Sequence, residues 1–121
     1  MKKILIVDDS PSIITLVRIS LSSIDNVELF EASSGEHALE IINNNNDISL
    51  LITDLMMPGM SGWDLIKKVR GNISLKNINV LILTSEYTVL SSSKYYESGA
   101  NDILLKPFRS ERILQKVNEL L

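Results

Sequence analysis

Two kinds of hydrophobic pattern alternate along the chain. Short, unbroken apolar runs are separated by longer stretches in which apolar and polar residues are mixed. Unbroken runs are typical of strands that are buried on both faces of a parallel sheet. They cover residues 4–7, 50–52, 80–83 and 103–105, with a weaker run at 27–30. The pattern therefore predicts five strands.

Between the runs, apolar residues recur at helical spacing. Residues three and four positions apart lie on one side of a helix, so each stretch has a face that packs against a sheet. A further helix, expected over residues 88–98, is interrupted by three serines. The four clear faces are formed by Ile13, Leu16, Val17 and Leu21; by Ala38, Leu39 and Ile42; by Leu65, Ile66 and Val69; and by Ile113, Leu114, Val117 and Leu121.

Serines and glycines predict where several helices begin and end. Serine favours the N-cap of a helix, and proline favours its first turn. Gly71 and Gly99 are expected at helix C-termini, where glycine tolerates the left-handed conformation. The expected starts are Ser10 followed by Pro11, and two pairs that resemble capping boxes, Ser33 with Glu36 and Ser61 with Asp64.

The elements follow the order strand then helix, five times over. This order predicts a doubly wound α/β domain in three layers, in which right-handed crossovers place helices on both faces of a parallel sheet. The length of 121 residues fits one domain. A chain of this size buries enough surface on folding to form a hydrophobic core.

Composition excludes several classes of protein. The net charge of −3 and the absence of a basic cluster argue against direct binding to nucleic acid or to an anionic membrane surface. Cysteine is absent, which excludes disulfides and thiolate chemistry. No apolar run is long enough for a signal peptide or a membrane span. We therefore expect a soluble cytoplasmic domain.

Residues whose side chains can react or bind an ion follow four of the predicted strands. Asp8 and Asp9 end the first strand, Asp54 the third, Thr84 the fourth and Lys106 the fifth. Ligands of open parallel α/β sheets bind outside the carboxyl ends of the strands, so all five residues belong to the functional edge. If the first and third strands are neighbours, the three carboxylates converge.

Three converging carboxylates repel one another, and a hard divalent cation relieves the repulsion. Mg²⁺ prefers oxygen ligands, and the lack of cysteine argues against a soft metal. The set also suits phosphoryl transfer, with Asp54 as a carboxylate nucleophile and with Mg²⁺, the Thr84 hydroxyl and the Lys106 ammonium around the phosphoryl oxygens. The chain lacks a glycine-rich phosphate loop, so a nucleotide is not expected to be the direct donor.

Four segments in this order resemble the response-regulator receiver domain of two-component signalling, as found in single-domain chemotaxis regulators. They read ILIVDDSP, LLITDLMMPGMSGWDL, VLILTS and GANDILLKPF, and together they span the chain. The resemblance implies a flavodoxin-like (βα)5 fold with strand order 2-1-3-4-5, a type for which the chemotaxis regulator is a standard example. It also implies that residues 1–121 form one receiver domain.

The resemblance further implies individual roles at the acidic edge. Asp54 is expected to be the phosphoacceptor and a metal ligand. Asp9 is expected to bind Mg²⁺ directly, Asp8 mainly through water, and Met56 through its main-chain carbonyl. Lys106 is expected to pair with the phosphoryl group and to precede a cis peptide bond. Such a chain catalyses only its own phosphorylation and dephosphorylation, so we do not expect an enzyme that acts on other substrates.

The resemblance also implies partners. The donor is expected to be a phosphohistidine on a sensor histidine kinase or a phosphotransfer protein, and Thr84 is expected to hydrogen-bond the transferred group. The face formed by the fourth helix, fifth strand and fifth helix is expected to carry the signal to a downstream protein, or to a second phosphorylated copy.

His37, the single histidine, is expected to be exposed in the middle of a helix, without a role in phosphoryl transfer.

Two departures leave alternatives open. Receiver domains often have Tyr or Phe three residues before the lysine, and the rotamer of that ring reports phosphorylation. This chain has Ile103 there, a β-branched aliphatic residue with restricted rotamers and no ring to rotate. A non-switching interaction domain is therefore the first alternative. A Mg²⁺-dependent phosphohydrolase is the second, although such enzymes usually carry an acid two residues after the nucleophile, and here that residue is Met56.

Overall fold

A five-stranded parallel sheet forms the centre of the protein. The computed structural model describes residues 1–121. The strands lie in the order β2-β1-β3-β4-β5, which confirms the predicted order and makes the first and third strands neighbours. Each strand is slightly longer than its apolar run. The strands are β1 (Lys2–Val7), β2 (Val27–Ala32), β3 (Leu50–Asp54), β4 (Asn79–Thr84) and β5 (Asp102–Leu105).

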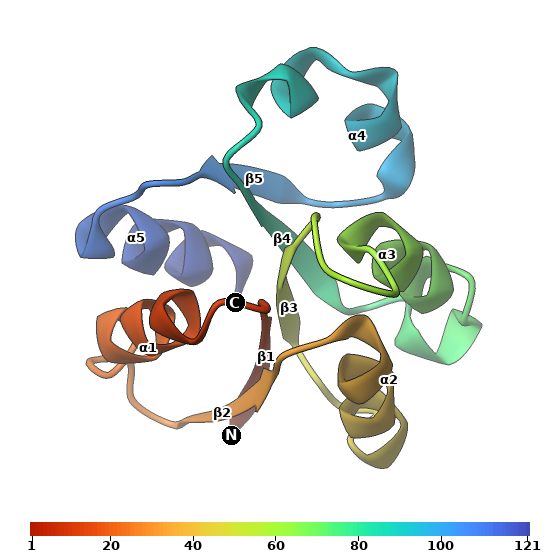
Figure 1. Cartoon of the computed structure of the whole chain (residues 1–121). Coiled ribbons are helices and arrows are strands. Elements are labelled where there is room, and N and C mark those ends of the chain that lie inside the picture. Colours follow the sequence, from red (N-terminus) through yellow and green to blue (C-terminus); the bar gives the residue numbers. More distant parts are fainter.

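Helices cover both faces of the sheet, as predicted. Figure 1 shows α1 and α5 together on one face and α2 and α3 on the other, with α4 beside α3. The α-helices are α1 (Pro11–Ser20), α2 (Gly35–Asn44), α3 (Gly62–Arg70), α4 (Ser93–Ser98) and α5 (Ser110–Leu120), and two short 3₁₀ helices are η1 (Ile73–Leu75) and η2 (Tyr87–Ser91).

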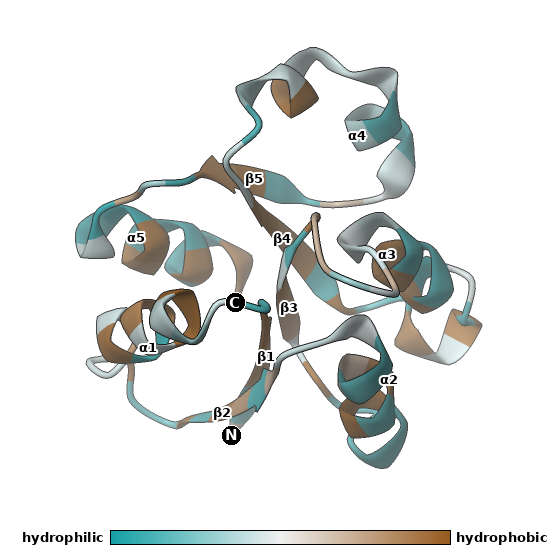
Figure 2. Ribbon diagram, viewed as in Figure 1, coloured by the Kyte–Doolittle hydropathy of each residue, from teal (hydrophilic) through white to brown (hydrophobic).

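The sheet divides the hydrophobic core into two parts. Successive side chains of a strand point to opposite faces, so Ile4 and Ile6 pack towards α1 and α5 whereas Leu5 and Val7 pack towards α2 and α3. All five residues of β3 are buried. Figure 2 shows hydrophobic colour along the central strands and mixed colour on the helices. Burial on both faces explains why the strands appear as unbroken apolar runs.

Two of the three expected helix starts are confirmed. The Ser10 side chain accepts a hydrogen bond from the Ile13 amide at 3.4 Å, and Ser61 accepts one from the Asp64 amide at 3.2 Å.

The expected start of α2 at Ser33 was wrong by one residue. Ser34 is the N-cap, and its side chain accepts from the His37 amide at 3.1 Å. Glu36 does not complete a capping box, because its side chain lies against Gly59 of the loop after β3. His37 is exposed as expected, but it lies in the first turn of α2 rather than in the middle.

The predicted helix over residues 88–98 is divided into η2 and α4. Ser92 separates the two pieces: its hydroxyl donates to the Val89 carbonyl at 3.0 Å and accepts from the Tyr95 amide at 3.2 Å. A serine that bonds the local backbone in this way competes with a continuous helix. Gly99 ends α4 in the left-handed conformation (φ 85°), as expected, whereas Gly71 ends α3 at φ −77°.

Candidate phosphoacceptor site

The carboxyl ends of β1 and β3 bring three acidic residues together. Asp8 and Asp9 follow the last residue of β1, and Asp54 is the last residue of β3. Because these strands are paired, one carboxylate oxygen of each residue lies within 4.8 Å of the other two. Asp8 and Asp54 are buried, and Asp9 is exposed. The convergence predicted from the strand ends is confirmed.

Lys106 supplies the positive charge of the site from the end of β5. Its Nζ lies 2.8 Å from Asp8 Oδ2 and 3.3 Å from Asp54 Oδ2. The Lys106 amide donates to the Thr84 carbonyl at 2.8 Å, which ties the start of this segment to β4. The peptide bond between Lys106 and Pro107 is cis, as the resemblance implied. The ammonium therefore bridges acidic residues from two strands.

The Asp8 carboxyl group experiences opposing influences. Burial raises its pKa above the ordinary value, and the nearby Asp54 charge acts in the same direction. The hydrogen bond from Lys106 and the Ser10 amide, which donates to Asp8 Oδ1 at 2.9 Å, lower it. The net effect is a raised pKa. A proton, Lys106 or a metal ion can each offset the charge that burial disfavours.

The two oxygens of Asp54 have different surroundings. Oδ1 accepts a hydrogen bond from the Leu55 amide at 2.7 Å and a longer one from the Met56 amide at 3.4 Å. Oδ2 is the oxygen that faces Lys106. One oxygen is thus held by the chain itself, while the other points to the cation side of the site.

Gly62 was not predicted as a site residue, although the structure shows that it supports Asp54. Its amide donates to the Leu55 carbonyl at 2.9 Å, which folds the start of α3 back onto β3. A Cβ at this position would lie 1.9 Å from the Asp54 carbonyl oxygen, a distance that no side chain can occupy. Glycine is therefore required here for close approach. The loop glycines were visible in the sequence, but not what each approaches.

Thr84 reaches the same edge of the sheet at the end of β4. It is buried, and its hydroxyl oxygen accepts from the Glu86 amide at 3.1 Å. A hydroxyl that accepts one hydrogen bond still has its proton to donate. The structure shows no hydrogen bond between its side chain and Asp54 or Lys106.

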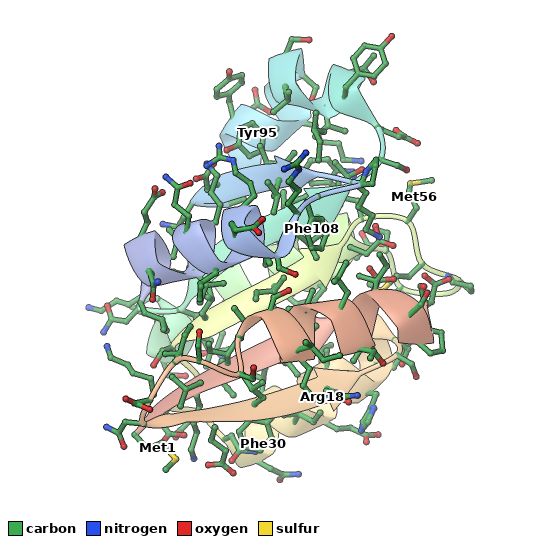
Figure 3. The ribbon with its side chains drawn as sticks, turned by 90° about the vertical axis from the view of Figure 1, so that its left-hand side faces the viewer. Met1, Arg18, Phe30, Met56, Tyr95 and Phe108 are labelled. Atoms are coloured by element: carbon green, nitrogen blue, oxygen red, sulfur yellow. The ribbon has the colours of Figure 1, made fainter.

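Met56 lies on the loop between β3 and α3. The residue is 62% exposed. Figure 3 shows it projecting from the carboxyl end of the sheet, at the opposite end from Met1.

Comparison with known proteins identifies the family. The sequence model of the response regulator receiver domain family matches residues 4–118 of this chain. The chain belongs to the response regulator receiver family. Chemotaxis protein CheY1 of Helicobacter pylori is 34% identical over 119 residues, which cover 98% of this chain and 96% of that protein. The two-component response regulator ORR7 of Oryza sativa subsp. japonica is 37% identical over 98% of this chain and 56% of its own length.

Solved structures of receiver domains agree with this assignment. The chemotaxis response regulator CheY4 of Vibrio cholerae matches with a TM-score of 0.89 and 32% identity, over 100% of this chain and 99% of that one. The BeF3-activated receiver domain of DrrB matches with a TM-score of 0.81 and 28% identity. Membership of this family means phosphorylation-dependent signalling, and receiver domains are signalling proteins rather than enzymes with separate substrates.

The donor set of this receiver domain fits a magnesium ion. Three carboxylates against one ammonium leave a formal charge of −2, which matches one divalent cation. The converging atoms are hard oxygens, and no sulfur or imidazole ligand is among them.

The helices of the structure include none with the length and apolar character of a membrane span.

Proposed function

We propose that this receiver domain accepts a phosphoryl group on Asp54 and changes its binding to a partner in response. The donor in this proposal is a phosphohistidine of a sensor histidine kinase or a phosphotransfer protein. The observation that carries the proposal is the convergence of three carboxylates within 4.8 Å, with the Lys106 ammonium against two of them. The same convergence favours it over a domain that retains the fold without the chemistry.

In the transfer step, Asp54 Oδ2 attacks the phosphorus atom. A bond forms between that oxygen and phosphorus while the bond from phosphorus to the imidazole nitrogen breaks, and the electron pair stays on the nitrogen. Leu55 and Met56 hold Oδ1 through their amides, which leaves Oδ2 as the accepting atom. Lys106 and the Thr84 hydroxyl then stabilise charge on the phosphoryl oxygens.

Asp8, Asp9 and Asp54, with the main-chain carbonyl of Met56, are the residues that we expect to hold Mg²⁺. A bound Mg²⁺ would neutralise charge on the carboxylates and on the phosphoryl oxygens. Lys106 is close enough to Asp8 and Asp54 to shift its interaction from a carboxylate to a phosphoryl group. The added charge on phosphorylated Asp54 would thereby change the conformation of the loops after β4 and β5.

The output surface in this proposal is the face formed by α4, β5 and α5. A groove of about 860 Å³ lies on the part of this face formed by β5 and α5, with Leu90 of η2 at its side. Its lining combines apolar side chains, including Leu90 and Phe108, with basic and acidic ones, and Lys116 forms an ion pair with Asp102 there. A downstream protein, or a second phosphorylated copy, would bind this face. Ile103 is buried beside the groove, so switching here would rely on displacement of loops rather than on rotation of an aromatic ring.

Intact-mass measurement tests the proposal. The wild-type protein, incubated with a small acyl phosphate and Mg²⁺, should gain one phosphoryl group, and Asp54→Asn should gain none. Asp25→Asn is a matched control, because Asp25 is exposed and lies before β2, outside the site. Equal phosphorylation of wild type and Asp54→Asn would overturn the assignment of the acceptor.

A further inference from the structure

Thr53 is a polar residue in the middle of the hydrophobic core. It is fully buried in β3, and Leu51 and Leu55, which point to the same face of the sheet, both belong to the core. Valine has nearly the same shape and would avoid the cost of burying a hydroxyl group. The hydroxyl therefore needs a partner, and its partner is the carbonyl oxygen of Asp54, to which it donates at 2.8 Å.

This hydrogen bond acts on the peptide unit that joins Asp54 to Leu55. The carbonyl end of that unit accepts from the Thr53 hydroxyl at 2.8 Å. The amide end, the N–H of Leu55, donates to Asp54 Oδ1 at 2.7 Å. Because a peptide unit is planar, fixing its carbonyl also fixes the direction of its N–H. The Thr53 hydroxyl is thus linked through one rigid plane to one oxygen of the carboxylate.

The Leu55 amide and Lys106 contact different oxygens of Asp54, so the carboxylate has one orientation in the site. With Oδ1 held by the Leu55 amide, Oδ2 remains directed towards Lys106 at 3.3 Å. The terminal torsion of an aspartate is broad, so without such a hold the carboxylate would sample other orientations. Gly62 approaches the same carbonyl oxygen from α3, which leaves little space for the peptide to move elsewhere.

We infer that Thr53 is a positioning residue, whose hydroxyl orients the Asp54–Leu55 peptide so that Oδ1 is held and Oδ2 is presented to the phosphoryl donor. This inference rests on the proposed function, because it concerns the accepting oxygen of Asp54. Thr53 touches neither the donor nor the metal site, and it acts only through the main chain of its neighbour.

The test compares variants that keep or remove the hydroxyl. Thr53→Val and Thr53→Ala remove it, and Thr53→Ser retains it. Valine suits a buried strand, so Thr53→Val is expected to fold. Ser20→Ala is the matched control, because Ser20 is another buried hydroxyl with bonds of 2.7 Å to Leu16 and 3.0 Å to Ser110, away from the site.

Phosphorylation by a small acyl phosphate with Mg²⁺ is the first measurement. Loss of one neutral orienting hydrogen bond should slow Thr53→Val and Thr53→Ala by about five- to tenfold. Thr53→Ser should stay within about twofold of wild type, as should Ser20→Ala. If wild type takes up no phosphate, the proposed function fails. If wild type is phosphorylated and Thr53→Val reacts as fast, the positioning role fails.

Hydrogen exchange of the Leu55 amide is the second measurement, and it needs neither metal nor phosphate. The amide should exchange faster in Thr53→Val than in wild type, with Thr53→Ser close to wild type. Amides in the middle of β3 should keep their protection from exchange, because the lost hydrogen bond acts only on the Asp54–Leu55 peptide. A general loss of strand stability would instead increase exchange along all of β3. Unchanged exchange of Leu55 in Thr53→Val, or equal loss of protection along β3, would overturn the inference.

Discussion

At the scale of single residues, Asp8 shows how the site balances charge against burial. Burial raises the pKa of its carboxyl group above the ordinary value of 3.8, and the contacts with Lys106 and Ser10 only partly offset this. The folded protein therefore keeps a proton on Asp8 at pH values where the unfolded chain has lost it. The contribution of Asp8 to stability is greatest at low pH and falls as the pH rises from 3.8 through the raised pKa.

We predict that Asp8→Asn removes this pH dependence, because asparagine does not titrate. The free energy of unfolding of the variant and of wild type is measured by urea denaturation with a chelator present. The value for the variant minus that for wild type should grow from about pH 4 up to the raised pKa and then stay constant. A difference that shrinks as the pH rises over this range would contradict the sign of the pKa shift.

Residue identity at the strand ends predicted the shared edge, and the convergence of the carboxylates followed only once β1 and β3 were known to be neighbours. Asp54 ends β3, Asp8 and Lys106 directly follow the ends of β1 and β5, and parallel strands share one carboxyl edge. The supporting roles of Thr53 and Gly62 could not be predicted, because each depends on the direction of one carbonyl group. A threonine in an apolar run is equally compatible with ordinary strand packing.

At the scale of elements, the segment between β4 and β5 departs most from the predicted pattern. Periodicity predicted one helix, whereas the chain forms η2 and α4 with Ser92 between them. The four longer α-helices have clear apolar faces and were predicted, but the six residues of α4 include no buried one. A short helix with little burial is set by local hydrogen bonds, which hydrophobic periodicity does not report.

Ser92→Ala should therefore loosen α4 without affecting the acidic site. Loss of an N-cap costs about 1 kcal/mol, so amide exchange in α4 should accelerate by roughly fivefold. Ser93→Ala is the control, because Ser93 is exposed and its side chain makes no hydrogen bond in the structure. Phosphorylation at Asp54 should proceed at the wild-type rate in both variants. Equal exchange in the two variants would show that the Ser92 cap does not hold α4.

At the scale of the whole molecule, a metal ion bound at the acidic edge would link the ends of β1 and β3 and should stabilise the fold. A ligand that binds only the folded state adds about 2.7 kcal/mol at a concentration of one hundred times its Kd. Mg²⁺ should therefore raise the melting temperature of the wild-type protein. Asp9→Asn should lose most of this effect and be more stable than wild type without metal, because it removes one of three neighbouring carboxylates.

Asp25→Asn provides the control for the magnesium effect, since it removes an exposed carboxylate outside the cluster. It should respond to Mg²⁺ as the wild-type protein does. If Mg²⁺ stabilised Asp9→Asn and wild type equally, the ion would be bound elsewhere. If Mg²⁺ stabilised neither, the acidic cluster would not be a magnesium site.

Chemical mapping of the phosphorylated residue tests the central claim most directly. Borohydride reduces an aspartyl-phosphate to homoserine, and peptide mass spectrometry then locates that residue in the chain. After incubation with a small acyl phosphate and Mg²⁺, we predict homoserine at residue 54 and at no other aspartate. Homoserine at residue 8 or 9, or a phosphorylated protein without homoserine at any position, would contradict the assignment of Asp54 as the phosphoacceptor.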